Sequence, residues 1–177
     1  KGQDGADTLN GNGGNDILIA DRNAGDDLDE VGTETTDDNL YGGSGNDKLF
    51  GNAGDNILDG GTGSDTIYSG NGSDTIVIRS GDGGASQSDG DTVTDFADET
   101  DSIGLDTITF GALTIAQVGS DTVIKEGSNF LTTLTGISAS NITVLDFQST
   151  STSNETYNGT SGNDALVGGS GGDTFNG

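Results

Sequence analysis

A nine-residue repeat constrains the fold of this chain more than any other feature of its sequence. Four contiguous units fill residues 42–77 and read GGSGNDKLF, GNAGDNILD, GGTGSDTIY and SGNGSDTIV. Two earlier units, GQDGADTLN and GNGGNDILI, fill residues 2–19. Two less regular units, 21–29 and 33–41, lie between these groups and are offset by short insertions. A fixed period of this length indicates a stack of small structural units, each packed on its neighbours.

Alignment of the eight units shows which positions are fixed. Position 4 is Gly in every unit except the two irregular ones. Position 8 is apolar in all eight: Leu9, Leu18, Leu28, Leu40, Leu49, Leu58, Ile67 and Ile76. Position 6 is Asp in all but one: Asp7, Asp16, Asp26, Asp38, Asp47, Asn56, Asp65 and Asp74.

These fixed positions predict an all-β fold. Gly adopts positive φ at little steric cost, so the first six residues of each unit are expected to form a turn. The last three residues suffice only for a short strand, in which position 8 points inward and its neighbours point outward. With two units per turn of the coil, the sequence predicts a right-handed parallel β-roll whose core is a stacked column of Leu and Ile.

Stacking of the units also brings position-6 carboxylates together on each side of the roll. We predict the order Asp7, Asp26, Asp47, Asp65 on one side and Asp16, Asp38, Asn56, Asp74 on the other. Each neighbouring pair is expected to face a gap lined by turn carbonyls, and such an all-oxygen site suits Ca²⁺ better than Mg²⁺. Asn56 lacks the charge and should weaken the sites it shares. The alternative, that Asp simply favours turns, does not explain why it recurs at one position.

Composition excludes several function classes. The chain has no Cys and no His, which removes the usual zinc sites and the thiol and imidazole nucleophiles. A net charge of -25 disfavours nucleic acid and anionic membranes as partners. No apolar run is long enough to span a bilayer, so we expect no direct membrane insertion. With only 28% hydrophobic residues, the chain needs bound cations to offset its charge and to supplement a small core.

The repeats resemble the RTX (repeats-in-toxin) family of calcium-binding nonapeptides. The units at 42–50 and 60–68, and GGSGGDTFN at 168–176, match its pattern G-G-x-G-x-D-x-U-x closely. The resemblance implies a parallel β-roll that holds several calcium ions between its turns. It also implies export by type I secretion, and therefore an extracellular or cell-surface location.

The remainder of the chain is predicted to contain a cap and the start of a second array. Residues 1–80 are assigned to the roll, 81–91 to a linker, 92–148 to an antiparallel β-rich cap of four to six strands, 149–157 to a second linker and 158–177 to a new RTX array. The motifs DTVTDF at 91–96, DSIGL at 101–105 and the run at 133–147 resemble the segment that follows the roll in serralysin-type proteases and alginate epimerase modules.

The candidate calcium-binding residues combine the position-6 side chains with residues of the turns and of the later segments. They are Asp7, Asp16, Asp26, Asp38, Asp47, Asn56, Asp65, Asp74, Asp91, Asp164, Asp173, Gly42, Gly45, Gly60 and Gly63. Asp47 with Asp65 is the pair that the repeat pattern supports best, while occupancy of sites using Asp26 and Asp38 stays open.

Three functions fit these features. The first is a calcium-binding structural module of a secreted or cell-surface protein that folds on Ca²⁺ binding after export. The second is a non-catalytic folding or polysaccharide-binding module of a secreted epimerase, protease or lipase. The third is a repeat of a surface-layer protein or adhesin, with neighbouring copies as partners. No catalytic constellation is visible, so we do not expect an enzyme, and residue 1 lies so close to a repeat that we expect a larger parent protein.

Overall fold

The computed structural model describes residues 1–2, 5–20, 35–150, 156–158 and 174–176, and its strands form three sheets. The described elements include three short 3-10 helices, Gln87–Asp89, Phe110–Ala112 and Val144–Asp146, but no helix long and apolar enough to cross a bilayer. The first sheet contains, in spatial order, β1 (Thr8–Gly13), β3 (Asn39–Ser44), β5 (Ile57–Thr62), β7 (Thr75–Arg79), β9 (Ser102–Asp106) and β13 (Phe147–Ser149). The second contains β10 (Leu113–Val118), β11 (Asp121–Glu126), β12 (Asn129–Leu134), β8 (Asp91–Val93), β6 (Thr66–Tyr68), β4 (Lys48–Phe50) and β2 (Ile17–Ile19).

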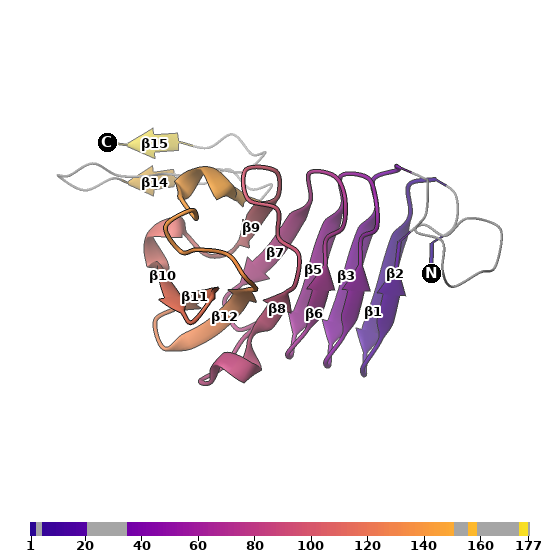
Figure 1. Cartoon of the computed structure of the whole chain (residues 1–177), viewed down its shortest axis with the longest axis horizontal. Coiled ribbons are helices and arrows are strands. Elements are labelled where there is room, and N and C mark those ends of the chain that lie inside the picture. Colours follow the sequence, from indigo (N-terminus) through magenta and orange to yellow (C-terminus); the bar gives the residue numbers. More distant parts are fainter. Residues whose placement is uncertain (3–4, 21–34, 151–155, 159–173, 177) are drawn as a thin grey trace.

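Successive repeat units alternate between these two sheets, which gives a parallel β-roll (Figure 1). Within the repeats every strand pair is parallel, and β3 pairs with β5 at an offset of 18 residues, which is two nonapeptides. The fold prediction is thus confirmed: the chain is all-β, with parallel sheets paired as in a β-roll and one antiparallel region.

Two columns of apolar side chains from position 8 form the centre of the roll. In the first sheet Leu40, Leu58 and Ile76 lie in register, and in the second Leu49 lies beside Ile67. All five are at most 1% exposed. Burial of one such side chain contributes about 1.5–3 kcal/mol, so these columns account for much of the roll's apolar cohesion. The neighbours of position 8 are more exposed, as the alternation predicted: Ile57, beside Leu58, is 38% exposed.

The cap continues both columns of the roll. Ile103 of β9 pairs with Ile76, and Val93 of β8 pairs with Ile67. Next along each sheet, Phe147 pairs with Ile103 and Leu134 pairs with Val93. The cap is therefore a direct extension of the repeat core.

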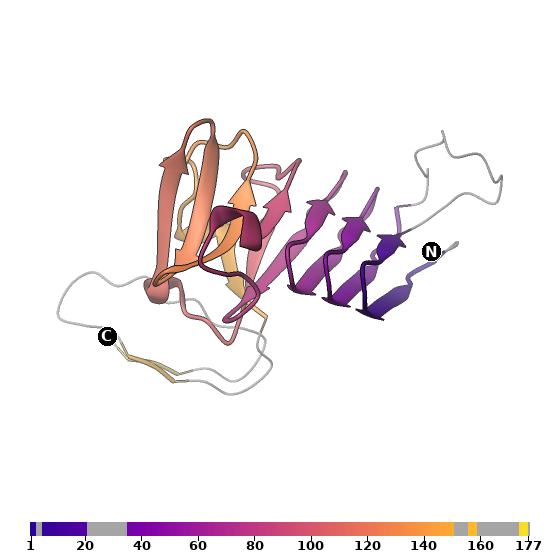
Figure 2. The same ribbon diagram turned by 90° about the horizontal axis from the view of Figure 1, so that it is seen from below.

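The antiparallel part of the cap is smaller than predicted. Among the described strands only β10, β11 and β12 pair antiparallel with one another, beside one isolated antiparallel bridge between Gly84 and Phe130. These three strands stand at the end of the roll far from the N-terminus (Figure 2). The strands β8, β9 and β13 pair parallel with the strands beside them, because they continue the register of the repeats. Within the run at 133–147, residues 144–146 form a 3-10 helix and no strand.

The second array is described only at its two short strands. β14 (Thr156–Asn158) pairs parallel with β15 (Thr174–Asn176), and Thr156 lies opposite Thr174, again 18 residues apart. The candidate ligands Asp26, Asp164 and Asp173 lie outside the described residues.

Candidate metal centre

Side chains at position 6 form two ladders, one along each side of the roll. In each rung the backbone N–H of one position-6 residue donates to the Oδ1 atom of the position-6 residue in the next layer. The first, here called the Asp47 ladder, runs Asp16, Asp47, Asp65, Asp91, with N–Oδ1 distances of 2.6, 2.7 and 2.9 Å. The second, the Asn56 ladder, runs Asp7, Asp38, Asn56, Asp74, Asp101, with distances of 2.7, 2.9, 2.8 and 3.1 Å.

This order corrects the predicted one at the irregular units. The prediction placed Asp7 on the side of Asp47, and Asp16 on the side of Asp38. Instead, the first unit stacks directly on the fourth, with Leu9 opposite Leu40 in the β1–β3 pair, and the second stacks on the fifth. The offset is 31 residues rather than 18, so the first and fourth units form adjacent layers. Asp7 therefore lies on the side of Asp38, and Asp16 on the side of Asp47.

Both ladders continue past the last repeat. Asp91 accepts the N–H of Asp65, and Asp101 accepts the N–H of Asp74. Asp91 was among the predicted residues, whereas Asp101 was not. A signal for both is present in the sequence, because DTV at 91–93 and DSI at 101–103 repeat the Asp–x–apolar spacing of positions 6 to 8.

The second carboxylate oxygen of most ladder residues is buried without a hydrogen-bond partner. This is true of the Oδ2 atoms of Asp16, Asp47, Asp65, Asp74 and Asp91. A buried, unpaired carboxylate oxygen is costly, and a cation with oxygen ligands is the usual partner that offsets the cost. Five such atoms in repeated positions fit a row of calcium ions.

The glycines at position 1 leave space beside these oxygens. A Cβ atom built on Gly42 would lie 2.5 Å from the Oδ2 atom of Asp47 and 2.5 Å from the carbonyl oxygen of Gly60. A carboxylate oxygen of one layer and a turn carbonyl of the next therefore border the same small volume. At Gly60 an added Cβ would overlap the Oδ2 atom of Asp65 in the same way. This donor set of carboxylate and carbonyl oxygens is the one that Ca²⁺ prefers.

The glycines at position 4 serve the stacking. Gly45 and Gly63 have backbone φ angles of +128° and +134°, which residues other than glycine rarely adopt. A Cβ on Gly63 would overlap the carbonyl of Gly45, and one on Gly45 would overlap the carbonyl of Gly14. These residues allow successive turns to lie in direct contact, which sets the spacing between the ladder carboxylates.

Asn56 shows what the Oδ2 position faces. Its Nδ2 atom takes that place and donates to the carbonyls of Gly51 and Gly54, at 3.2 and 3.1 Å. Two turn carbonyls thus point at the Asn56 amide group, which donates an N–H to each of them. An aspartate in the same place puts a negative oxygen near two more oxygens, an arrangement that requires a cation.

Burial also changes the acidity of these groups. Desolvation raises the pKa of Asp74 to about 7 and raises the pKa of Asp65 above its ordinary value. It raises the pKa of Asp91 well above that value, with the charge of Asp65 adding to the effect. Without a nearby cation the Asp74 carboxyl is partly protonated near neutral pH, so calcium and protons compete for its oxygens.

The ladder sites depend on backbone oxygens. Across the described ranges no three acidic side chains are arranged to hold a metal ion by themselves.

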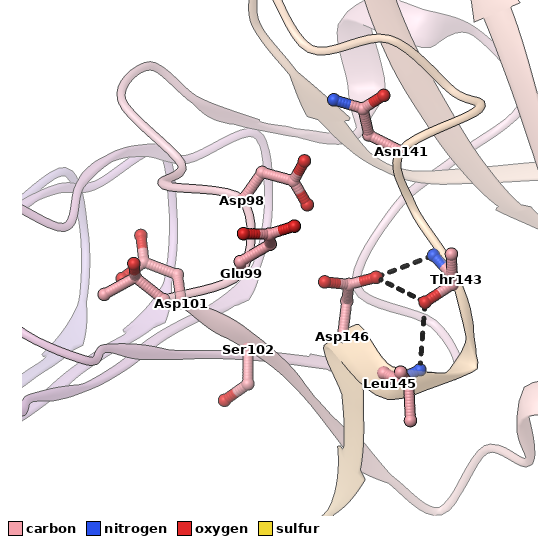
Figure 3. A pocket seen from close by; sticks show the side chains of 9 residues that line it. Asp98, Glu99, Asp101, Ser102, Asn141, Thr143, Leu145 and Asp146 are labelled. Atoms are coloured by element: carbon pink, nitrogen blue, oxygen red, sulfur yellow. Dashed lines mark hydrogen bonds between the residues drawn. The ribbon is translucent and has the colours of Figure 1, made fainter.

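A cavity of about 650 Å³ at the cap is lined by four acidic residues, Asp98, Glu99, Asp101 and Asp146 (Figure 3). Its two buried carboxylates are satisfied by protein donors: Asp146 accepts from Thr143, and Asp101 from Ala97 and Ser69. This cavity therefore lacks the unpaired oxygens that mark the ladders.

Comparison with known proteins agrees with this geometry. The family model described as "RTX calcium-binding nonapeptide repeat (4 copies)" matches residues 1–28, 34–67, 41–76, 50–85 and 149–177. No match is found among curated proteins.

Two solved structures share the fold. The extracellular lipase LipA from Serratia marcescens superposes with a TM-score of 0.57 at 21% identity, over 79% of this chain and 20% of the lipase. The AlgE6R3 subunit of the mannuronan C5-epimerase from Azotobacter vinelandii superposes with a TM-score of 0.51 at 25% identity, over 77% of this chain and 79% of that subunit. The chain thus spans about a fifth of the lipase but most of the epimerase subunit.

Proposed function

Since the chain belongs to the RTX calcium-binding nonapeptide repeat family, we propose that it is a calcium-dependent structural module of a larger secreted protein, folding on Ca²⁺ binding after export. The observation that carries this proposal is the set of buried, unpaired Oδ2 atoms along the two ladders. Among the described residues, the ligands proposed on their unpaired oxygens are Asp16, Asp47, Asp65, Asp74 and Asp91. Asp7 and Asp38 are proposed on the repeat pattern, and carbonyls of the turns that contain Gly42, Gly45, Gly60 and Gly63 complete the sites. Asp26, Asp164 and Asp173 are proposed as ligands on the repeat pattern alone.

For Asn56, which the repeat pattern places among the candidate ligands, we propose a different role. Its amide already satisfies the carbonyls of Gly51 and Gly54, so we assign it as a rung that holds its turn without calcium. In the other rungs, bound calcium offsets the negative charge of the carboxylates. The backbone N–H of the preceding layer holds each carboxylate in place through its Oδ1 atom.

The parent protein is proposed to be a secreted enzyme in which this chain has no catalytic part. The chain covers most of the epimerase subunit, whereas it covers only a fifth of the lipase, which is the pattern expected of an accessory module. The proposed division is a roll at 1–80, a cap at 92–148 and a second array at 158–177. Few basic residues, 5 of 177, argue against an extended track for an anionic polysaccharide on this module.

Calcium titration of the wild-type chain and of Asn56→Asp tests this proposal. Isothermal calorimetry and native mass spectrometry should show several bound ions for the wild type, and Mg²⁺ should not replace them, because it prefers a smaller octahedral site. Asn56→Asp should bind one ion more, since it places a carboxylate oxygen against two turn carbonyls.

The matched control is Asn71→Asp, which adds the same charge at an exposed turn residue and should leave the ion count unchanged. A wild-type chain that binds no calcium would overturn the function. If Asn56→Asp bound the same number of calcium ions as the wild type, the proposal that calcium lies at the Oδ2 atoms would be overturned.

A further inference from the structure

The segment directly after the last repeat imitates a repeat turn. In regular layers the N–H of the position-4 glycine donates to the position-3 carbonyl of the next layer, as Gly45 does to Thr62 at 2.9 Å. At the last layer of this side, Gly63 donates instead to the carbonyl of Asp82, at 3.5 Å. Asp91 takes the place of the next position-6 residue, because it accepts the N–H of Asp65. Residues 82 and 91 therefore stand where positions 3 and 6 of a further unit would stand.

Asp82 also brings a carboxylate to this junction. Its side chain is 1% exposed, and its Oδ2 atom accepts the N–H of Arg79 at 2.8 Å. Its Oδ1 atom is buried and accepts no hydrogen bond. The negative charge of Asp65 raises the pKa of Asp82, and the negative charge of Asp82 raises the pKa of Asp91. The three carboxylates therefore repel one another.

Arg79 forms only a long ion pair with this carboxylate and donates no side-chain hydrogen bond to it. Its guanidinium makes hydrogen bonds with Asp59, at 2.9 Å through Nη1, and with Asp106, at 3.0 Å through Nε. Its nearest approach to the Oδ1 atom of Asp82 is 3.7 Å, beyond hydrogen-bond distance. One arginine thus faces three carboxylates, and Asp65 and Asp91 add two more nearby. Buried like charges repel each other unless another cation is bound.

We propose that Asp82 completes a terminal calcium site between the last repeat turn and the segment 82–91, together with Asp65 and Asp91. Three buried carboxylate oxygens without hydrogen bonds, one from each residue, lie at this end of the Asp47 ladder. Turn carbonyls complete the coordination, since the three side chains alone do not form a cage. This inference rests on the proposed function and extends it to a residue outside the repeats, in a segment whose sequence reads as a linker.

The other side of the roll ends differently. The carboxylate of Asp101 accepts the N–H of Asp74 through Oδ1, and the N–H of Ala97 and hydroxyl of Ser69 through Oδ2. Protein donors satisfy both of its oxygens, so the Asn56 ladder closes without an ion at Asp101. The contrast predicts that a carboxylate from beyond the repeats binds calcium on one side of the roll only, the side of Asp82 and Asp91.

Counting bound calcium in Asp82→Asn tests this inference. Native mass spectrometry at saturating Ca²⁺ should find one ion fewer than in the wild type, and the calcium-induced rise in melting temperature should be smaller. The matched control is Asp59→Asn, which also removes an Arg79 partner but no unpaired oxygen, and it should keep the wild-type count.

A folded Asp82→Asn chain that binds as many ions as the wild type would overturn the inference and leave the repeat sites standing. If the wild type itself bound no calcium, the proposed function would fail instead. Should Asp82→Asn not fold, the calcium-loaded wild-type crystal structure decides. An ion at about 2.3–2.6 Å from the Oδ1 atom of Asp82 supports the terminal site. An Asp82 carboxylate paired with Arg79 alone overturns it.

Discussion

Removal of calcium with a chelator is expected to unfold the roll. The metal-free chain has a net charge of -25 and places rows of buried carboxylates one layer apart. At tenfold excess over Kd, each ion contributes about 1.4 kcal/mol, so five sites contribute about 7 kcal/mol. That is comparable with the whole stability of an ordinary domain. Far-UV circular dichroism should therefore lose its β-sheet signal in chelator and regain it when Ca²⁺, but not Mg²⁺, is added back.

The pH of this experiment matters. The folded-state pKa of Asp74 is raised from 3.8 to about 7 by burial. A raised pKa stabilises the metal-free fold at acid pH, and this contribution is lost as the pH rises from about 4 through about 7. Unfolding by chelator should thus be most complete above neutral pH. A chain that keeps its full β-sheet signal there, with calcium removed, would show that the fold does not depend on the ions.

Substitution of Gly63 by Ala is expected to be the most damaging small change within the repeats. The added Cβ meets the carbonyl of Gly45 in the adjacent layer, and backbone atoms cannot move aside without separating the stacked turns. The positive φ of +134° adds strain of about 1–3 kcal/mol. Together these effects should exceed about 3 kcal/mol, which lowers the melting temperature of the calcium-loaded chain by about 10 °C in calorimetry.

Gly14→Ala provides the control for this prediction. Gly14 occupies the same repeat position with φ of +104°, but a Cβ there would meet no atom within 4 Å, because no described layer precedes it on that side. It should show the backbone strain alone, with a much smaller fall in melting temperature. Equal effects of the two substitutions would mean that contact between turns is not what Gly63 protects.

The repeat period predicted the roll, its core and the residue type at position 6, because each of these depends on one residue type at one position. Leu40, Leu49, Leu58 and Ile67 are buried as their position requires. The predicted positions 1 and 4 also hold the glycines at which a side chain would collide with the next layer, at Gly42 and Gly63 for example.

The register of the irregular units could not be predicted in the same way. Every unit except the one with Asn56 carries the same Asp–x–apolar signal, so sequence alone does not say which units stack on each other. The 31-residue step from Asp7 to Asp38 follows from the pairing of β1 with β3. An alignment of the nonapeptides does not show which units pair with one another.

Asp82, in the segment at 81–91 predicted as a linker, was missed for a related reason. The segment has no large apolar side chain, and such a composition is typical of an exposed linker. Yet Asp82 and Asp91 are 3% and 1% exposed. Stacking on the turn of Asp65 buries them, and stacking is a property of the fold that local composition does not report.

The anomalous difference map from crystals grown with saturating Ca²⁺ tests the central claim most directly. The claim is that calcium between stacked turns supplies the counter-charge for the ladder carboxylates. The map is predicted to show an ion between the layers beside Asp47 and Asp65, bound to their Oδ2 atoms and to turn carbonyls, and none at the amide of Asn56. An ordered roll with no ion beside Asp47 or Asp65 would contradict the claim.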